Sequence, residues 1–173
     1  MPKKIRPIRV EGNIAYITLT KGYEAIIDAE DVHMVDSGNW YAMIAGNTVY
    51  ACRRVHSGMH SRIVLLHRVL MEPPDGLVVD HIDGNGLNNR RRASNCNIRI
   101  ATRSQNLMNS GIYKHNVSGF RGVSWDKAKQ KWRANVMMDG RSIHLGYFLT
   151  PEDASATYER VSKELYGHFR RMT

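Results

Sequence analysis

Asp80 and His81 are adjacent at the end of an apolar run that begins at Val78. A hard divalent cation prefers oxygen ligands such as an Asp carboxylate or an Asn carbonyl, and it stabilises the charge that develops on a phosphate and its leaving oxygen. A neutral histidine can take the proton from an attacking water. The pair therefore offers side chains that phosphodiester hydrolysis needs, although Asp-His beside a Gly- and Asn-rich loop also fits an ordinary turn.

The elements around this pair can bring a third side chain to it. The pattern predicts a strand over 78–81, a polar loop, a second short strand over 98–101, and a helix that begins at Thr102. Thr102 and Gln105 have the spacing of a capping box, which satisfies the first free backbone amides of a helix. Asn106 then lies one turn into the helix, on a face that can look back at the strand carrying Asp80.

The segment before this group reads as short strands and turns. Apolar stretches predict strands over 14–19 and 23–27, a short helix within 29–36, and a hairpin of 40–44 and 48–53. A helix is expected over 64–71, and Pro73-Pro74 must end it. Cys52, His56 and His60 have a spacing that could bind a metal on a helix, whereas Ser57-Gly58 favours a turn.

A separate small module is expected after a polar linker. Three strands are predicted over 120–125, 131–138 and 141–148, with a hairpin turn at Asp139-Gly140 and a helix that Thr150 and Pro151 begin. Alternation along 131–138 places Lys131, Arg133, Asn135 and Met137 on one face. Such a face can lie in the DNA major groove, where Arg reads guanine and Asn reads adenine, or it can simply be solvated.

Charge narrows the class of partner. The 173 residues include 25 Lys and Arg against 16 Asp and Glu, which gives a formal net charge of +9. No acidic residue occurs between Asp83 and Asp126, and this stretch holds several arginines that we expect to contact nucleic acid, namely Arg90, Arg91 and Arg103. Phosphate backbone is the commonest anion that neutralises such a stretch. A soluble basic protein without this partner would have the same composition.

The stretch around Asp80 resembles the HNH endonucleases of the phage homing type. The resemblance rests on Leu66-His67-Arg68, on Val79 to Arg91, and on Asn97 to Asn106. It implies a ββα-metal fold in which His81 is the general base, Asp80 and Asn106 hold one Mg²⁺ or Mn²⁺, and Asn97 braces the loop. His67 matches a family position with a structural or phosphate-contacting role. Residues 92–95 look inserted, which leaves the bracing Asn open between Asn95 and Asn97, with Asn97 favoured by its spacing to Asn106.

The C-terminal module resembles the Apetala-type (ethylene-response-factor) DNA-binding domain. Phe120 to Val123, Lys131 to Ala134, Ile143 to Phe148 and Glu152 to Tyr158 carry this likeness. The positions that match the DNA-contacting ones of that family are Arg121, Ser124, Asn135, Met137 and His144, with Trp125, Lys131 and Arg133 nearby. Ser124, Met137 and His144 depart from the plant pattern, so the base preference of the plant domains cannot be transferred.

Together these observations predict an α+β protein with four segments: a strand-rich segment over 1–59, an HNH nuclease over 60–110, a linker over 111–118 and a DNA-binding domain over 119–173. The expected function is metal-dependent nicking of double-stranded DNA by a monomer or homodimer, with no small-molecule substrate. A non-catalytic, sequence-specific DNA-binding protein with a degenerate nuclease site is the alternative. No apolar run approaches the length of a membrane span, and a cytoplasmic location, in the host if the chain is phage-encoded, is expected.

Overall fold

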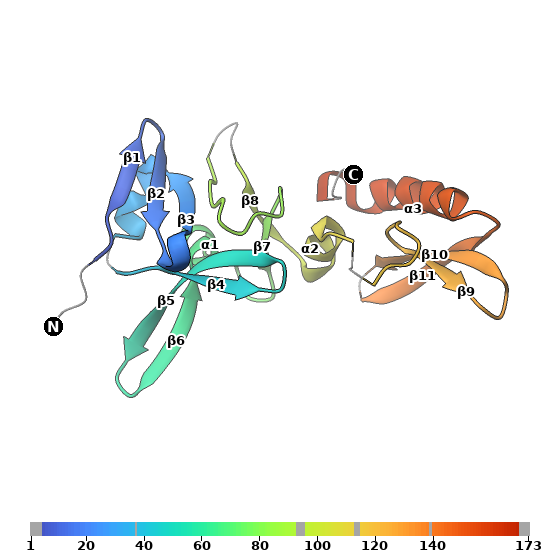
Figure 1. Ribbon diagram of the computed structural model, residues 1–173, viewed down its shortest axis with the longest axis horizontal. Helices are drawn as coiled ribbons and strands as arrows, with labels where there is room; N and C mark the ends of the chain where they lie inside the picture. The colour runs from blue at the N-terminus through green and yellow to red at the C-terminus, as the bar shows by residue number, and fades with distance from the viewer. Residues whose placement is uncertain (1–4, 37, 93–95, 113–114, 139, 170–173) are drawn as a thin grey trace. The chain divides into compact units, whose positions relative to one another are not determined.

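A computed structural model describes residues 5–36, 38–92, 96–112, 115–138 and 140–169. Small antiparallel sheets and a few helices make up a mixed α+β protein, as the sequence predicted (Figure 1). The described residues fall into two compact units, one ending at Ala101 and the other beginning at Thr102. The four-segment division of the sequence stays a prediction. In the part of the chain described, no helix is long and apolar enough to cross a membrane.

The first unit begins with an antiparallel sheet in the order β1-β2-β3, formed by β1 (Ile8–Glu11), β2 (Ile14–Thr18) and β3 (Glu24–Asp28). The 3-10 helix η1 (Thr20–Gly22) joins β2 to β3, and η2 (Ala29–Met34) follows β3. Alternate side chains of β2 and β3, such as Ile17 and Ile27, are buried. The predicted strands and short helix are confirmed, and β1 is an additional strand that pairs with β2.

A second sheet contains β4 (Tyr41–Ala45), β5 (Thr48–Ser57) and β6 (His60–Leu65), and α1 (Leu66–Met71) follows. The predicted hairpin is confirmed, but the helix expected over 64–71 is wrong at its start. Val64 and Leu65 belong to β6 because they pair with Arg53 and Cys52 of β5. The idea of a helical metal site at Cys52, His56 and His60 is also wrong, since all three lie on strands and only Cys52 is buried.

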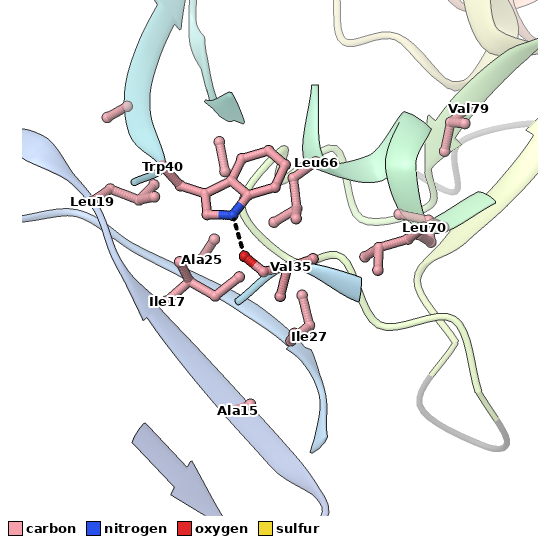
Figure 2. Close-up of a cluster of buried hydrophobic side chains, with 13 residues drawn as sticks. Ala15, Ile17, Leu19, Ala25, Ile27, Val35, Trp40, Leu66, Leu70 and Val79 are labelled. Carbon is pink, nitrogen blue, oxygen red and sulfur yellow. Dashed lines mark hydrogen bonds between the residues drawn. The ribbon is translucent and has the colours of Figure 1, made fainter. Parts of the chain in front are cut away.

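One apolar core holds these elements together (Figure 2). Trp40 is 1% exposed, and its indole Nε1 donates to the Val35 carbonyl at 2.9 Å. Leu66 and Leu70 extend the core from α1 to Val79 and Ile98. The last two residues belong to the third sheet, an antiparallel pair of β7 (Val78–His81) and β8 (Ile98–Ala101). The core therefore fixes the strands that carry Asp80 and His81.

The second unit begins with α2 (Arg103–Asn109), where Thr102 and Gln105 form the predicted capping box. A sheet in the order β11-β10-β9 follows, built from β9 (Val123–Asp126), β10 (Lys131–Met138) and β11 (Arg141–Phe148). The predicted strand over 120–125 starts three residues late, at Val123, because Gly122 has a left-handed φ of 69°. Asp139 of the predicted turn lies outside the described residues.

Helix α3 (Pro151–Tyr166), capped by Thr150 as predicted, covers one face of this sheet, and η4 (Gly167–Phe169) ends the described chain (Figure 1). Ala154 of α3 packs with Val123 and Ala134 of the sheet. The pairing of β10 with β11 shifts register between Ala134 and Asn135. One face of the sheet therefore packs against α3 through apolar side chains, and the helix leaves the other face uncovered.

Candidate active site and nucleic-acid interface

The β7–β8 pair buries both residues of the proposed catalytic group. Asp80 lies opposite Arg99, and His81 lies opposite Ile98. Asp80 is 3% exposed and His81 is 7% exposed. Burying a polar or charged side chain costs free energy unless it is hydrogen-bonded or ion-paired, so the partners of Asp80 and His81 determine their chemistry.

The His81 imidazole is oriented by Asn89, a fully buried residue of the loop between β7 and β8. The Asn89 Nδ2 donates to the Leu87 carbonyl at 3.0 Å, which turns its Oδ1 toward His81 Nε2 at 3.2 Å. Because Oδ1 can only accept, Nε2 carries the hydrogen and Nδ1 has the lone pair. Burial lowers the pKa of His81, against the opposing effect of the Asn89 hydrogen bond and the carboxylates of Asp83 and Asp80. The ring is therefore neutral near pH 7, as a proton acceptor must be.

The Asp80 carboxylate faces Arg99 across the strand pair. The Arg99 Nε donates to Oδ2 of Asp80 at 2.9 Å, and an Arg99 terminal nitrogen lies 2.8 Å from the same oxygen. Among the described residues, no group of three or more His, Cys, Asp or Glu side chains could hold a metal ion. A cation here would need Asp80 together with neutral oxygen donors, a set that fits Mg²⁺, which is often bound by one or two carboxylates, waters and substrate phosphates.

Asn97 braces the loop from the start of β8. Its Oδ1 accepts from the Asp83 amide at 3.1 Å, and its Nδ2 donates to Asp83 Oδ1 at 2.9 Å and to the Asn88 carbonyl at 2.8 Å. Asn88 Nδ2 also donates to Asp83 Oδ2 at 3.0 Å. Asn97 is 6% exposed, so these bonds replace the water it would otherwise meet. Asn95, the other candidate for the bracing position, lies outside the described residues.

The far end of the loop is tied to η2 by arginines. Arg91 donates from Nε and from a terminal nitrogen to the two oxygens of Asp31, each at 2.8 Å, and also to the Leu70 carbonyl. Arg92 donates to Asp31 Oδ1 at 2.9 Å. Hydrogen bonds from Arg91 lower the pKa of Asp31 most, with burial opposing and Arg92 adding to the decrease. The guanidinium of Arg91 therefore holds the end of the loop against η2. The Nε of Arg90 instead donates a hydrogen bond to Oδ1 of Asn88 within the loop.

His67 of α1 and Tyr50 of β5 contribute rings beside His81. The His67 and His81 ring centroids are 5.0 Å apart, and Tyr50 lies 5.6 Å from His67 and 5.9 Å from His81. Burial, His81 and Arg68 together lower the pKa of His67 to about 3. Since His67 is 6% exposed, its surroundings favour the structural one of its two expected roles. Nothing in the sequence indicated that Tyr50 belongs to this site, because it is far from His81 along the chain.

The remaining residue of the predicted metal group lies on α2, in the second unit. Asn106 and Arg103 are both exposed there, one turn apart on the capped helix. The pairing of Asn106 with Asp80 stays a prediction, as do the nucleic-acid contacts of Arg90, Arg91 and Arg103.

Most predicted DNA-contacting residues of the sheet share its uncovered face. Cross-strand register pairs Arg133 with Ser124 and Tyr147, and Asn135 with His144. His144 Nδ1 and Asn135 Oδ1 are 3.0 Å apart, and the buried Nε of Arg133 has no hydrogen-bond partner among the described residues. Lys131 and Met137 alternate with the buried residues of β10 and so belong to this face.

Two predicted contacts lie elsewhere. Trp125 pairs with Trp132 in an edge-to-face contact with ring centroids 5.1 Å apart, on the face that α3 covers. The Arg121 guanidinium donates to the Met108 carbonyl of α2. Arg121 also lines a cavity of about 330 Å³ with Met108, Met137 and Tyr158. Both side chains therefore make contacts within the second unit, and their contacts with DNA stay predictions.

Comparison with known proteins identifies viral homologues. The protein named Uncharacterized HNH endonuclease L560, of Acanthamoeba polyphaga mimivirus, is 29% identical over 161 residues, which are 91% of this chain and 80% of that protein. Protein 3.8 of Escherichia phage T7 is 36% identical over 98 residues, which are 57% of this chain and 77% of that protein. The chain belongs to the family of that phage protein. No protein-family model matches the chain, and no solved structure matches it.

Proposed function

We propose that this protein is a metal-dependent HNH endonuclease that hydrolyses one strand of double-stranded DNA. The observation that carries the proposal is the buried His81, held by Asn89 in the tautomer with its lone pair on Nδ1, beside Asp80 at the end of β7. The viral relative named as an HNH endonuclease supports the same class. The β7–β8 pair and α2 would then be the ββα-metal element of that class.

In the proposed mechanism, neutral His81 takes a proton from the water that attacks the phosphorus. Asn89 keeps the lone pair of His81 on Nδ1, and Asn97 keeps the loop closed around the site. Asp80 and Asn106 would hold one Mg²⁺ or Mn²⁺, which supplies stabilisation of charge on the phosphate and on the leaving 3′ oxygen. The assignment of Asn106 rests on its spacing from Thr102 and on the sequence resemblance.

The second unit would position the nuclease on DNA. Arg133, Asn135 and His144 lie on the sheet face that α3 leaves uncovered, and these side chains can donate to or accept from base edges or phosphates. Ser124, Lys131 and Met137 complete the proposed contact face. This Apetala-type reading carries over no base preference. A single nuclease site in each chain favours a nick, and a double-strand break would need a dimer or two events.

A non-catalytic DNA-binding protein is the second candidate, and one observation favours it. The guanidinium of Arg99 engages the carboxylate of Asp80, so a cation must compete with an arginine for that side chain. If the arginine wins, the protein would bind DNA without cutting it.

Metal dependence separates the two candidates. Supercoiled plasmid, or duplex with candidate target sites, is incubated at low salt with Mg²⁺ or Mn²⁺, with and without EDTA. The nuclease predicts open circles that EDTA abolishes and that Asp80→Asn abolishes at equal DNA binding. Intact DNA under every metal condition, with a retained gel shift, would favour the binding-only protein.

A further inference from the structure

We propose that the ring of Tyr50 holds the imidazole of His81 in its reactive orientation, which makes Tyr50 a positioning residue of the proposed nuclease. Tyr50 lies on β5, in a different sheet from His81. This inference rests on the proposed function, and it adds a residue outside the motif that carries the resemblance.

Three rings meet in pairs around the base. His67 meets His81 edge-on, with an angle of 84° between the ring planes, and Tyr50 meets His67 at 69°. The Tyr50 and His81 planes are tilted by 56°. The hydrogen bond to Asn89 fixes the Nε2 end of the His81 ring but permits rotation about that bond. The rings of His67 and Tyr50 restrict this rotation, because turning the imidazole would push ring atoms closer than van der Waals contact.

The loop after His81 also approaches Tyr50 closely, at Gly86. A Cβ at Gly86 would lie 2.6 Å from Cδ1 of Tyr50 and 2.6 Å from the carbonyl oxygen of Val49. No side chain fits at these separations, so the loop can reach β5 only with glycine at this position. Gly86 is buried, and Leu87 and Asn89 follow it in the chain. The same loop therefore supplies the hydrogen bond to His81 and confines the ring of Tyr50.

Confinement of this kind matters for rate because a general base must meet its proton within narrow limits of distance and angle. A displacement near 1 Å can cost on the order of a hundredfold in rate. The ring of Tyr50, rather than its hydroxyl, makes the contacts described above. Tyr50→Phe keeps the ring, Tyr50→Leu removes it, and Gly86→Ala displaces it.

The test measures single-turnover cleavage by the full chain with Mg²⁺, for wild type and variants, over a range of DNA concentrations. We expect Tyr50→Leu and Gly86→Ala to lower the maximal rate about ten- to a hundredfold with little change in the half-saturating DNA concentration. Tyr50→Phe should be close to wild type. Tyr16→Leu, on β2 in the same unit, is the matched control and should leave the rate unchanged.

A cycle with His81→Ala shows whether Tyr50 acts through the base. If it does, Tyr50→Leu has no further effect on the residual rate of His81→Ala. An equal loss in both backgrounds, or a loss in Tyr50→Phe as large as in Tyr50→Leu, would overturn the proposal. Cleavage by wild type that Tyr50→Leu leaves unchanged would also overturn it.

A second readout does not depend on activity. The side-chain NMR signals of His81, assigned by their absence in His81→Ala, should shift in Tyr50→Leu and Gly86→Ala while Tyr50→Phe preserves them. Unchanged signals in folded Tyr50→Leu would contradict the contact itself. Failure of the proposed function is a separate result, because it is the absence of metal-dependent cleavage by the wild-type protein.

Discussion

At the scale of single residues, amide side chains help to hold the loop beside the candidate site. Asn97 makes three hydrogen bonds to Asp83 and Asn88, and Asn89 links Leu87 to His81. Asn97 ties the end of the loop to Asp83 and Asn88, and Asn89 ties the loop to the last residue of β7. Loss of one amide leaves buried partners unsatisfied, which costs more than the bond itself contributes.

Asn97→Ala should lower the free energy of unfolding of the first unit by about 2–4 kcal/mol, because it leaves the buried Asn88 carbonyl and the Asp83 amide without this partner. Urea unfolding followed by tryptophan fluorescence measures the change, since Trp40 lies in the core of this unit. Asn47→Ala, at an exposed turn, is the control and should change stability by less than about 0.5 kcal/mol. Equal effects of the two substitutions would show that Asn97 does not brace the loop.

At the scale of elements, an ion pair connects the loop to η2 across about sixty positions of sequence. Asp31 is fully buried, and the side chain of Arg91 is 25% exposed. The pKa of Asp31 lies below its ordinary value of 3.8, so the pair stabilises the folded state above that pH. The stabilisation is lost as the pH falls through 3.8 toward the lower folded pKa.

Asp31→Asn should therefore destabilise the protein by about 2–3 kcal/mol near pH 7, less than for a fully buried pair because the arginines are partly exposed. The difference from wild type should shrink as the pH drops below about 4, where the wild-type carboxylate takes up a proton. Thermal unfolding from pH 7 to pH 3 measures both effects. Glu30→Gln is the control, because it removes only the exposed ion pair of Glu30 with Arg92 and should have a much smaller effect. A pH-independent difference for Asp31→Asn would contradict the ion-pair account.

The uncovered face of the C-terminal sheet leads to a second prediction about elements. Arg133→Ala should weaken binding to duplex DNA by about 1–3 kcal/mol, since Arg133 lies near the centre of that face. Lys163→Ala removes a positive charge from an exposed position of α3 and should have a smaller effect. Fluorescence anisotropy at several salt concentrations compares them. Losses of the same size would mean that net charge, rather than this face, governs binding.

Local patterns predicted the elements whose signals are local. The capping box at Thr102, the cap at Thr150 and the alternation of β10 all describe neighbours in sequence, and the structure contains them. The predicted start of α1 was wrong because Val64 and Leu65 pair with β5, and this pairing stabilises them more than a further helical turn would. Strand pairing between distant segments decided that boundary, and no window around residue 64 contains it.

At the scale of the whole molecule, the same contrast holds for the candidate site. Asp80, His81 and Asn97 belong to one stretch of sequence, and the structure places them at the two ends of the loop between β7 and β8, while their catalytic roles stay predictions. Tyr50 and Asp31 come from other elements, so their contacts with the site depend on how the sheets pack. The charge of Arg91 gave no hint of its ion pair with Asp31, and its contact with nucleic acid stays a prediction.

In the proposed function, the uncovered face of the C-terminal sheet would hold DNA, with support from the net charge of +9, and β7, β8 and α2 would cut it. DNA binding alone is compatible with both candidate functions. Cleavage that depends on His81 is therefore the result that distinguishes the nuclease from a binding-only protein.

The most direct measurement is the rate of metal-dependent nicking by wild type and by His81→Ala, on the same DNA and at saturating protein. The account predicts a fall of about 10²–10⁴ in rate with unchanged DNA binding, because the general base is lost. Loss of its hydrogen bond to the buried Asn89 lowers the unfolding temperature, so both rates are measured well below it. Nicking by His81→Ala at the wild-type rate would contradict it and would assign the cleavage to another site.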